Sequence, residues 1–346
     1  MTPDADVLVV GGGPVGLAAA VEARLAGLTA LVVEPRRPPV DKACGEGLMP
    51  QAVSALDRLG VQPPGRPLAG IAYVRGAQRA EHRFAGEPGR GVRRTVLHEA
   101  LDRRAAGLGV ARHAAKVVAV EQDPGSVTAR CSDGRALRGR WLLGCDGLHS
   151  AVRRLTGLEA APARRRVRRY GVRRHYRVAP WTDLVEVHWG RRTEAYVTPV
   201  GPGLVGVALL GPAPIDVDEE LAAMPRLAAH LRGAPVEAAD RGAGPLRQAT
   251  RARASDRVLL VGDASGYVDA LTGEGLRLGF AQARAAVAHL DDPAGYERAW
   301  SAATRDYRLL TSALVAAATS PLRGAIVPAA VRLPPVFGAA VERLAR

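Results

Sequence analysis

The chain has 346 residues, of which 47% are hydrophobic and 24% charged. This length and composition fit a folded protein with one or two large cores and exclude a disordered one. The formal net charge of +14 raises the alternative of an arginine-rich nucleic-acid-binding protein. The sequence disfavours that class, because its densest basic run, ARRRVRRYGVRRHYRV, matches no nucleic-acid-binding motif.

The N-terminus, the apolar stretches and the cysteines indicate the cellular compartment of the protein. MTPDA leads directly into DVLVVGGG, without the basic and apolar segments of a signal peptide. The longest apolar stretch is interrupted by Arg323, Arg332 and prolines, so no uninterrupted span of about 20 residues could cross a bilayer. The three cysteines form neither a disulfide framework nor a metal-ligand spacing. We therefore predict a cytoplasmic protein with no metal.

The first residues have the pattern of a dinucleotide-binding unit. DVLVV (6–10) is a short apolar run typical of a buried parallel strand. It is followed by G-x-G-x-x-G at Gly11, Gly13 and Gly16, and then by the helical run LAAAVEARLAG. In this motif Gly11 permits the tight turn, Gly13 lets a pyrophosphate approach the backbone, and Gly16 lets the helix pack closely on the sheet. The helix N-terminus faces the phosphates.

A second buried strand, TALVVE (29–34), completes the unit with an acid at its end. Glu34 can accept hydrogen bonds from an adenosine ribose and would repel a 2′-phosphate. Strand, glycine turn, helix, strand and acid in this order predict dinucleotide binding. GPGLVG (201–206) matches the same glycine pattern, but Pro202 and the strand-like run that follows indicate a hairpin turn there.

Two later segments repeat the combination of a strand with a glycine-containing turn. In residues 125–154 a hairpin is predicted at Asp133-Gly134, and the next strand runs into Asp146-Gly147. In residues 257–290 a strand, a turn at Gly262-Asp263 and a glycine-containing loop precede a long helix. A glycine motif near residue 11 and a second near residue 262 indicate one cofactor held by distant parts of the chain.

Between them, residues 165–210 break into short runs: VRRYGVRRHYRV, LVEVHW, TEAYVTPV and LVGVALL. Turn signals at this spacing predict an antiparallel meander. We expect the arginines that alternate through residues 164–177 to lie on its solvated face. His175, His188, Trp189 and Tyr196 could line a pocket or do chemistry, although the sequence shows no activating partner for any of them.

The three ordered motifs, G-x-G-x-x-G, CDGLHSAVR and LLVGDAS…GEG, span about residues 5–290. They resemble the FAD-dependent monooxygenase superfamily typified by p-hydroxybenzoate hydroxylase, and its geranylgeranyl reductase relatives. The resemblance implies an α/β fold in which an antiparallel-sheet (α+β) substrate domain interrupts an FAD-binding Rossmann domain of the glutathione-reductase type. We expect FAD binding in 1–70, 90–160 and 250–300, the substrate domain in 71–89 and 161–249, and a C-terminal helical segment in 301–346.

The resemblance also implies which residues bind a non-covalent FAD. Asp263 would contact the ribityl or pyrophosphate region, and Asp146 would lie near the pyrophosphate. Gly273 and Gly275 would bring backbone close to the isoalloxazine, and Arg94 would contact the diphosphate. The full expected set is Gly11, Gly13, Pro14, Val15, Gly16, Glu34, Arg36, Lys42, Cys44, Arg94, Asp146, Gly147, Gly262, Asp263, Gly273, Gly275 and Leu276.

DKACGEGLMP (41–50) falls where the family's chain crosses over the flavin. Lys42 could meet phosphates or a substrate anion. Cys44 has no resolving partner, and the sequence leaves open whether its thiol is chemically required or packs as a small hydrophobic wall. Tyr196 and Cys44 are the catalytic candidates, and the expected substrate pocket consists of His188, Tyr196 and Pro199.

The motifs leave the reaction open between two branches. We favour a monooxygenase that uses NAD(P)H and O2 to hydroxylate a small hydrophobic aromatic substrate, phenolic or polyketide-like. The alternative is a reductase of isoprenoid C=C bonds. CGEGL and LTGEG resemble that branch, but YVTP replaces its Y-x-W-x-F-P signature. The halogenase motif W-x-W-x-I-P is also absent. The C-terminal helix either packs on the FAD domain or forms an apolar, basic rim at a membrane surface.

Overall fold

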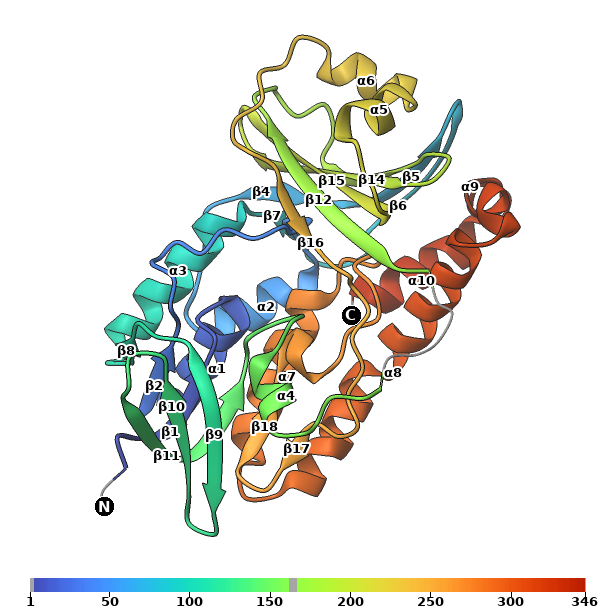
Figure 1. The fold of residues 1–346 in the computed structure, drawn as a ribbon. Helices are drawn as coiled ribbons and strands as arrows, with labels where there is room; N and C mark the ends of the chain where they lie inside the picture. Colours follow the sequence, from blue (N-terminus) through green and yellow to red (C-terminus); the bar gives the residue numbers. More distant parts are fainter. Residues whose placement is uncertain (1–2, 162–166, 346) are drawn as a thin grey trace.

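The computed structural model describes residues 3–161 and 167–345. Figure 1 shows two main β-sheets at opposite ends of the molecule, with helices packed around and between them. A third sheet consists of three short strands, β3 (Gly47–Leu48), β4 (Arg66–Leu68) and β7 (Gly89–Gly91). The result is a mixed α/β fold with several sheets and a helical C-terminus. The domain boundaries stay a prediction.

An eight-stranded sheet supports the N-terminal glycine motif. Its strands are β1 (Ala5–Val10), β2 (Ala30–Val33), β8 (Ala111–His113), β9 (Val117–Asp123), β10 (Ser126–Cys131), β11 (Ala136–Gly144), β17 (Ala254–Ser255) and β18 (Val258–Leu260). β18, β11, β1, β2 and β8 run parallel in that order. β1 and β2 confirm the two predicted strands. Their runs are apolar throughout because parallel strands covered by helices are buried on both faces. The predicted hairpin between β10 and β11 is also present.

Helices pack against the eight-stranded sheet and against one another beside it. They are α1 (Pro14–Leu25), α2 (Pro50–Arg58), α3 (Arg94–Gly107), α4 (Ala151–Leu155) and α7 (Gly275–Ala288). Leu17, Val21 and Phe280 share one buried cluster in which α1 meets α3 and α7. α1 begins directly after the glycine turn that follows β1, so its N-terminus lies at the end of the parallel strands.

The second large sheet has seven strands: β5 (Gly70–Arg75), β6 (Gln78–Arg83), β12 (Arg169–Tyr176), β13 (Leu184–Trp189), β14 (Glu194–Gly201), β15 (Leu204–Pro212) and β16 (Arg241–Ala243). The order is β16-β12-β15-β14-β13-β5-β6, and only β13 and β5 pair in parallel. β14 and β15 form an antiparallel hairpin across residues 201–204. This confirms that GPGLVG is a hairpin turn. The helices α5 (Val217–Ala222) and α6 (Pro225–Leu231) cover one face.

The expectation that the arginines of residues 164–177 lie on a solvated face is wrong for two of them. Arg169 and Arg173 on β12 are 4% and 2% exposed. Each meets carboxylates from distant segments, Asp269 and Glu194 for Arg169 and Asp41 for Arg173. Paired charges can be buried, and a local pattern does not show such partners. Arg164–Arg166 lie outside the described residues.

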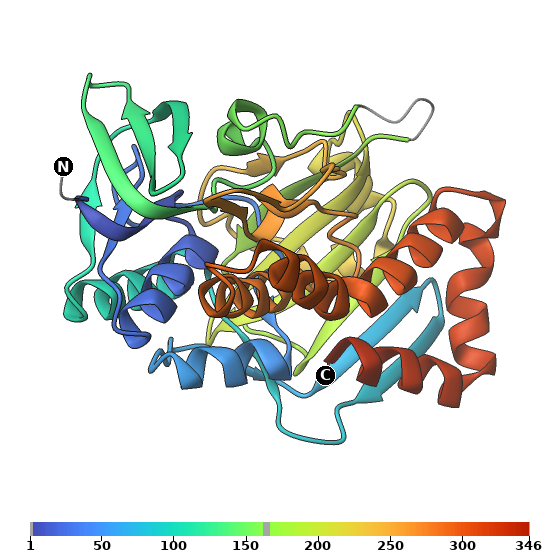
Figure 2. The ribbon, with the colours of Figure 1, turned by 90° about the horizontal axis from the view of Figure 1, so that it is seen from below.

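The C-terminal helices extend from the first large sheet to the second. They are α8 (Pro293–Ala318), α9 (Ile326–Arg332) and α10 (Pro334–Ala345), with a short 3-10 turn at Pro321–Ala325. α8 packs Tyr296 and Trp300 into the core of the eight-stranded sheet. α9 and α10 lie against β6, beside the β5–β6 hairpin in Figure 2. No single helix in the described part of the chain is long and apolar enough to cross a membrane, but α8 and Pro321–Arg332 pass that test together, bent by 99°.

Candidate functional site

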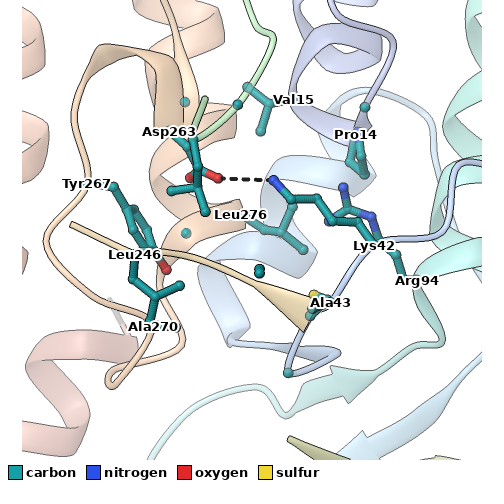
Figure 3. A pocket seen from close by; sticks show the side chains of 18 of the residues that line it. Pro14, Val15, Lys42, Ala43, Arg94, Leu246, Asp263, Tyr267, Ala270 and Leu276 are labelled. Carbon is teal, nitrogen blue, oxygen red and sulfur yellow. Dashed lines mark ion pairs between the residues drawn. The ribbon is translucent and has the colours of Figure 1, made fainter. Parts of the chain in front are cut away.

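A single cavity of about 860 Å³ connects the glycine motif with the seven-stranded sheet. All the expected cofactor residues except Gly16 line it, although they come from five separate stretches of the chain. Figure 3 shows Pro14, Lys42 and Arg94 on one side of the cavity, and Leu246, Tyr267 and Ala270 on another. The fold therefore brings the sequence motifs to one place.

Each position of the glycine motif requires a glycine for a different local reason. Gly11 adopts a φ of +106°, and a Cβ on it would lie 2.5 Å from the carbonyl oxygen of Cys145. A Cβ on Gly16 would lie 1.8 Å from the carbonyl oxygen of Gly11, so Gly16 allows α1 to pack without itself lining the cavity. A Cβ on Gly13 would meet only Arg94 Nη2, at 3.7 Å. Gly13 thus leaves space that a phosphate can use.

Polar groups at this end match an anionic cofactor with hydroxyl groups. Arg94 Nε and Asp146 Oδ1 are buried without a hydrogen-bond partner, and both residues line the cavity. Asp146 Oδ2 accepts hydrogen bonds from the backbone N–H groups of Ala151 and Val152, which fixes the carboxylate. Lys42 Nζ lies 4.0 Å from Asp263 Oδ2 (Figure 3). Buried polar atoms without partners are rare, and an FAD diphosphate and ribityl chain would satisfy them.

Glu34 is almost fully buried at the end of β2. Its Oε2 accepts a hydrogen bond of 2.9 Å from the Gly12 N–H, and Arg36 holds both carboxylate oxygens. Burial alone would raise the pKa of Glu34, but the hydrogen bonds from Arg36 and Gly12 outweigh it and lower that pKa. Glu34 is therefore an ionised acceptor at the cavity wall, as a ribose contact requires.

The other end of the cavity is apolar. Its wall includes Ile71, Tyr73, Val185, Val187, Ala208, Leu210 and Leu246, and two residues of α10, Val341 and Leu344. Tyr196 lines this end, but its hydroxyl donates a hydrogen bond of 2.5 Å to the carbonyl oxygen of Leu271. Burial raises the pKa of Tyr196 well above its ordinary value. Tyr196 is thus a neutral side chain with its proton already engaged. Cys44 lies in the same cavity.

Two expected pocket residues do not reach the cavity. Val185 and Val187 of β13 line it, so the alternating residue His188 lies on the opposite face. There His188 Nε2 lies 3.0 Å from Glu186 Oε2. Pro199 packs its backbone carbonyl against Gly91, where a Cβ would lie only 1.8 Å away. Successive residues of a strand face opposite sides of the sheet. Val187 on β13 and Thr198 on β14 line the cavity, so the next residues, His188 and Pro199, point away from it.

Tyr267 is a cavity residue that motif reading missed. Its hydroxyl would lie 3.4 Å from a Cβ placed on Gly275, and it faces Leu246 and Ala270 in Figure 3. Burial raises the pKa of Tyr267 well above its ordinary value, so the hydroxyl stays protonated. Tyr267 stands between the Gly262-Asp263 turn and Gly273, and that position between two cofactor motifs was the available signal.

Three side chains that could ligate a metal gather outside this cavity. In the part of the chain that the structure describes, His113, Cys131 and Asp133 offer ligand atoms within 4.8 Å of one another. Burial raises the pKa of the Cys131 thiol, which disfavours the thiolate that a metal would bind. We assign no ion to this cluster.

Comparison with known proteins identifies the family. The family model described as FAD binding domain matches residues 4–294. The chain belongs to this FAD-binding family. Among solved structures, 2-methyl-3-hydroxypyridine-5-carboxylic acid oxygenase superposes with a TM-score of 0.74 at 22% identity, over 98% of this chain and 95% of that one. This similarity shows a shared fold.

Several curated members of the family are similar in sequence. Dialkyldecalin synthase of Streptomyces rugosporus is 31% identical over 80% of this chain and 63% of its own length. Menaquinone reductase of Mycobacterium tuberculosis is 32% identical over 87% of this chain and 80% of its own length. Rifampicin monooxygenase of Streptomyces venezuelae is 30% identical over 80% of this chain and 62% of its own length. The chain thus spans less than two thirds of the first and third relatives.

Glu274, between the two glycines expected at the isoalloxazine, makes protein stability depend on pH. Burial raises its pKa to about 7, against the opposing effect of Arg277. Below the ordinary value of 4.5 the folded and unfolded chains are both protonated. As the pH rises to 7, only the unfolded chain ionises, so folding loses on the order of 3 kcal/mol.

We expect Glu274→Gln to remove this loss. Urea unfolding of the parent protein and the variant at pH 5 and pH 8 measures it. The free energy of unfolding of the parent should fall relative to the variant between these two pH values. Equal changes in both proteins would show that Glu274 does not titrate in this range.

Proposed function

We propose that the protein is an FAD-dependent monooxygenase that takes reducing equivalents from NAD(P)H and transfers one oxygen atom of O2 to a small hydrophobic aromatic substrate. The observation that carries this proposal is the continuous cavity, which places the expected cofactor residues and an apolar chamber in one space. Bound FAD would supply the redox chemistry, and the protein supplies binding, orientation and exclusion of water.

The residues at the polar end are suited to hold the cofactor. Gly13 and the N-terminus of α1 would bind the diphosphate, with Arg94 beside it, and Glu34 would accept hydrogen bonds from the adenosine ribose. Asp263 and Asp146 would contact the hydroxyl-bearing middle of the cofactor. The backbone around Gly273 and Gly275 would approach its ring, because these glycines place no side chain in the way.

The apolar chamber favours an uncharged aromatic substrate. Val187, Ala208 and Leu210 of the seven-stranded sheet form one wall, and Leu246, in the loop that precedes β17, packs in the same cluster. A carboxylated substrate would need a cation here, whereas Lys42 lies at the polar end beside Asp263. The Tyr267 hydroxyl could donate a hydrogen bond to a phenolic oxygen, and Tyr196 would pack against the ring. A phenolic or polyketide-like compound fits this chemistry.

A second opening offers room for the reductant. A cavity of about 440 Å³ adjoins the first and shares Lys42, Leu148, His149 and Ala243 with it. A cation and an imidazole beside the Asp146-Gly147 turn suit a phosphate-bearing nucleotide. This arrangement supports NAD(P)H as the electron donor.

The C-terminus supports contact with a lipid surface. Leu322, Leu333 and Val336 are more than half exposed, with Arg332 among them. Val336 lies in the first turn of α10, and Val341 and Leu344 further along the same helix line the cavity. We propose a cytoplasmic enzyme that touches a membrane at this apolar, basic tip when it takes up a lipid-like substrate.

The alternative function is reduction of a C=C bond. It is supported by CGEGL at residues 44–48 and by the name of one relative, menaquinone reductase. Consumption of NADH or NADPH with a panel of phenols and prenyl compounds, with and without O2, separates the two. We expect turnover of a phenol that stops when O2 is removed. Turnover of a prenyl compound without O2 would establish the reductase instead.

A further inference from the structure

The inward face of β12 carries three buried ionisable side chains that do not line the cavity. Arg169, Arg173 and His175 alternate along the strand and are each at most 4% exposed. They face two loops that do line it, residues 41–47 and residues 266–274. None of the three belongs to the expected cofactor contacts or is one of the catalytic candidates Tyr196 and Cys44. His175, which the sequence suggested as a pocket residue, does not line the cavity.

His175 binds the first loop through Glu46. The Nε2 atom of His175 lies 2.6 Å from Glu46 Oε2, and Glu46 Oε1 accepts a hydrogen bond of 2.9 Å from the Arg94 N–H. Glu46 has a φ of +62°, a conformation that non-glycine residues rarely adopt. The contacts of its carboxylate therefore hold the loop in a backbone shape that it would otherwise leave.

Three neighbouring strands form the platform for this loop. Thr198 of β14, Gly206 of β15 and His175 of β12 lie opposite one another in register. Thr198 Oγ1 donates a hydrogen bond of 2.7 Å to the carbonyl oxygen of Gly45. A Cβ on Gly206 would lie 2.9 Å from Glu46 Oε2, so this glycine makes room for the carboxylate.

Arg173 sets the tautomer of His175. Its Nη1 lies 2.8 Å from His175 Nδ1, and a guanidinium can only donate. His175 Nδ1 is therefore unprotonated, and its Nε2 carries the proton that is donated to Glu46. The other end of Arg173 pairs with Asp41, at the start of the same loop. The chain Asp41–Arg173–His175–Glu46 thus ties both ends of the loop to β12.

Arg169 holds the second loop in a similar way. Its Nε donates a hydrogen bond of 2.9 Å to Asp269 Oδ2, and its Nη2 donates one of 2.6 Å to Glu194 Oε2. Asp269 Oδ1 in turn accepts from the Leu271 N–H at 3.1 Å. This contact precedes Gly273 by only two residues, so β12 also fixes the loop that leads to the expected ring-binding backbone.

We propose that β12 is a positioning strand for FAD. Arg169, Arg173 and His175 hold the two loops at the spacing that the cofactor requires, without touching it. A preformed site binds more tightly, because the loops need not be ordered when the ligand enters. The proposal depends on FAD binding and not on the identity of the substrate or the reaction.

Replacement of His175 tests this proposal through FAD itself. The apoprotein of His175→Ala should bind FAD about tenfold more weakly, because Glu46 loses its donor and the loop its shape. The midpoint potential of the bound flavin should shift as well. His175→Gln keeps an N–H donor towards Glu46 and should restore both quantities. Titration of flavin fluorescence and a redox titration measure them.

Two further variants separate positioning from general stability. Arg174 lies on the opposite face of β12 and pairs with Asp240, so Arg174→Gln should leave FAD affinity unchanged. Asp41→Asn alters the partly exposed end of the side-chain series Asp41–Arg173–His175–Glu46. It should lower the affinity for FAD about threefold, because Arg173 is then held less firmly. If His175→Ala does not fold, the FAD affinity and the flavin midpoint potential of Asp41→Asn decide whether the proposal holds. Parent-like FAD affinity and potential in the folded variants would overturn the proposal.

Discussion

Replacing Gly13 by valine is expected to weaken FAD binding strongly while the protein stays folded. Gly13 has a φ of −73° and a ψ of 175°, which any residue can adopt, and its Cβ would meet only Arg94 Nη2 at 3.7 Å. In the free protein the valine therefore costs no more than about 1 kcal/mol. Its side chain would stand where the diphosphate must approach the backbone, and we expect affinity to fall by about a hundredfold or more.

Fluorescence titration with FAD and thermal unfolding of the apoprotein measure the two effects separately. Gly107→Ala, at a glycine with no atom within 4 Å of the added Cβ, is the control and should leave FAD affinity unchanged. Because Gly107 is the last residue of α3, this change should raise stability by at most about 1 kcal/mol. Gly16→Ala should instead lower stability, since its Cβ would lie 1.8 Å from the Gly11 carbonyl oxygen. A Gly13→Val protein that binds FAD like its parent would show that the cofactor does not use this turn.

Replacing Arg169 by alanine is expected to cause the largest loss of stability. The change leaves the buried carboxylate of Asp269 without the guanidinium that pairs with it. Glu194 loses one of its two arginine partners and keeps Arg323. Removing one partner of a buried ion pair costs about 3–5 kcal/mol, since the remaining charge stays desolvated. Burial already raises the pKa of Asp269, so the unpaired carboxyl should take up a proton.

Urea unfolding gives the free energy of unfolding for this comparison. Arg169→Lys keeps the positive charge and should lose less than Arg169→Ala. Arg83 pairs with Asp183 at the surface, with both side chains more than half exposed, so Arg83→Ala should change stability little. Equal losses for Arg169→Ala and Arg83→Ala would contradict the account of the buried network.

The convergence of the expected cofactor residues on one cavity could be predicted because their signals are local. Gly11, Gly13 and Glu34 belong to one continuous strand–turn–helix–strand pattern, and the physical demands of that pattern do not depend on the rest of the fold. The Gly262-Asp263 turn follows the same logic. The structure accordingly brings these residues to one cavity.

The apolar end of the cavity depended on information that a single sequence does not carry. His188 faces away from the cavity because the register of β13 points Val187 inward, and a shift of one residue would have reversed this. The burial of Arg173 depends on Asp41, 132 residues away. Val341 and Leu344 reach the cavity only because α10 turns back towards it.

The measurement that tests the central claim most directly is the fate of oxygen in a reaction with isotope-labelled O2. The FAD-loaded protein, NAD(P)H and a hydrophobic phenol that it turns over would be mixed under the labelled gas, and the product analysed by mass spectrometry. The account predicts a hydroxylated product that carries one labelled oxygen atom from O2. A product without the label, or turnover that proceeds equally well without O2, would contradict it.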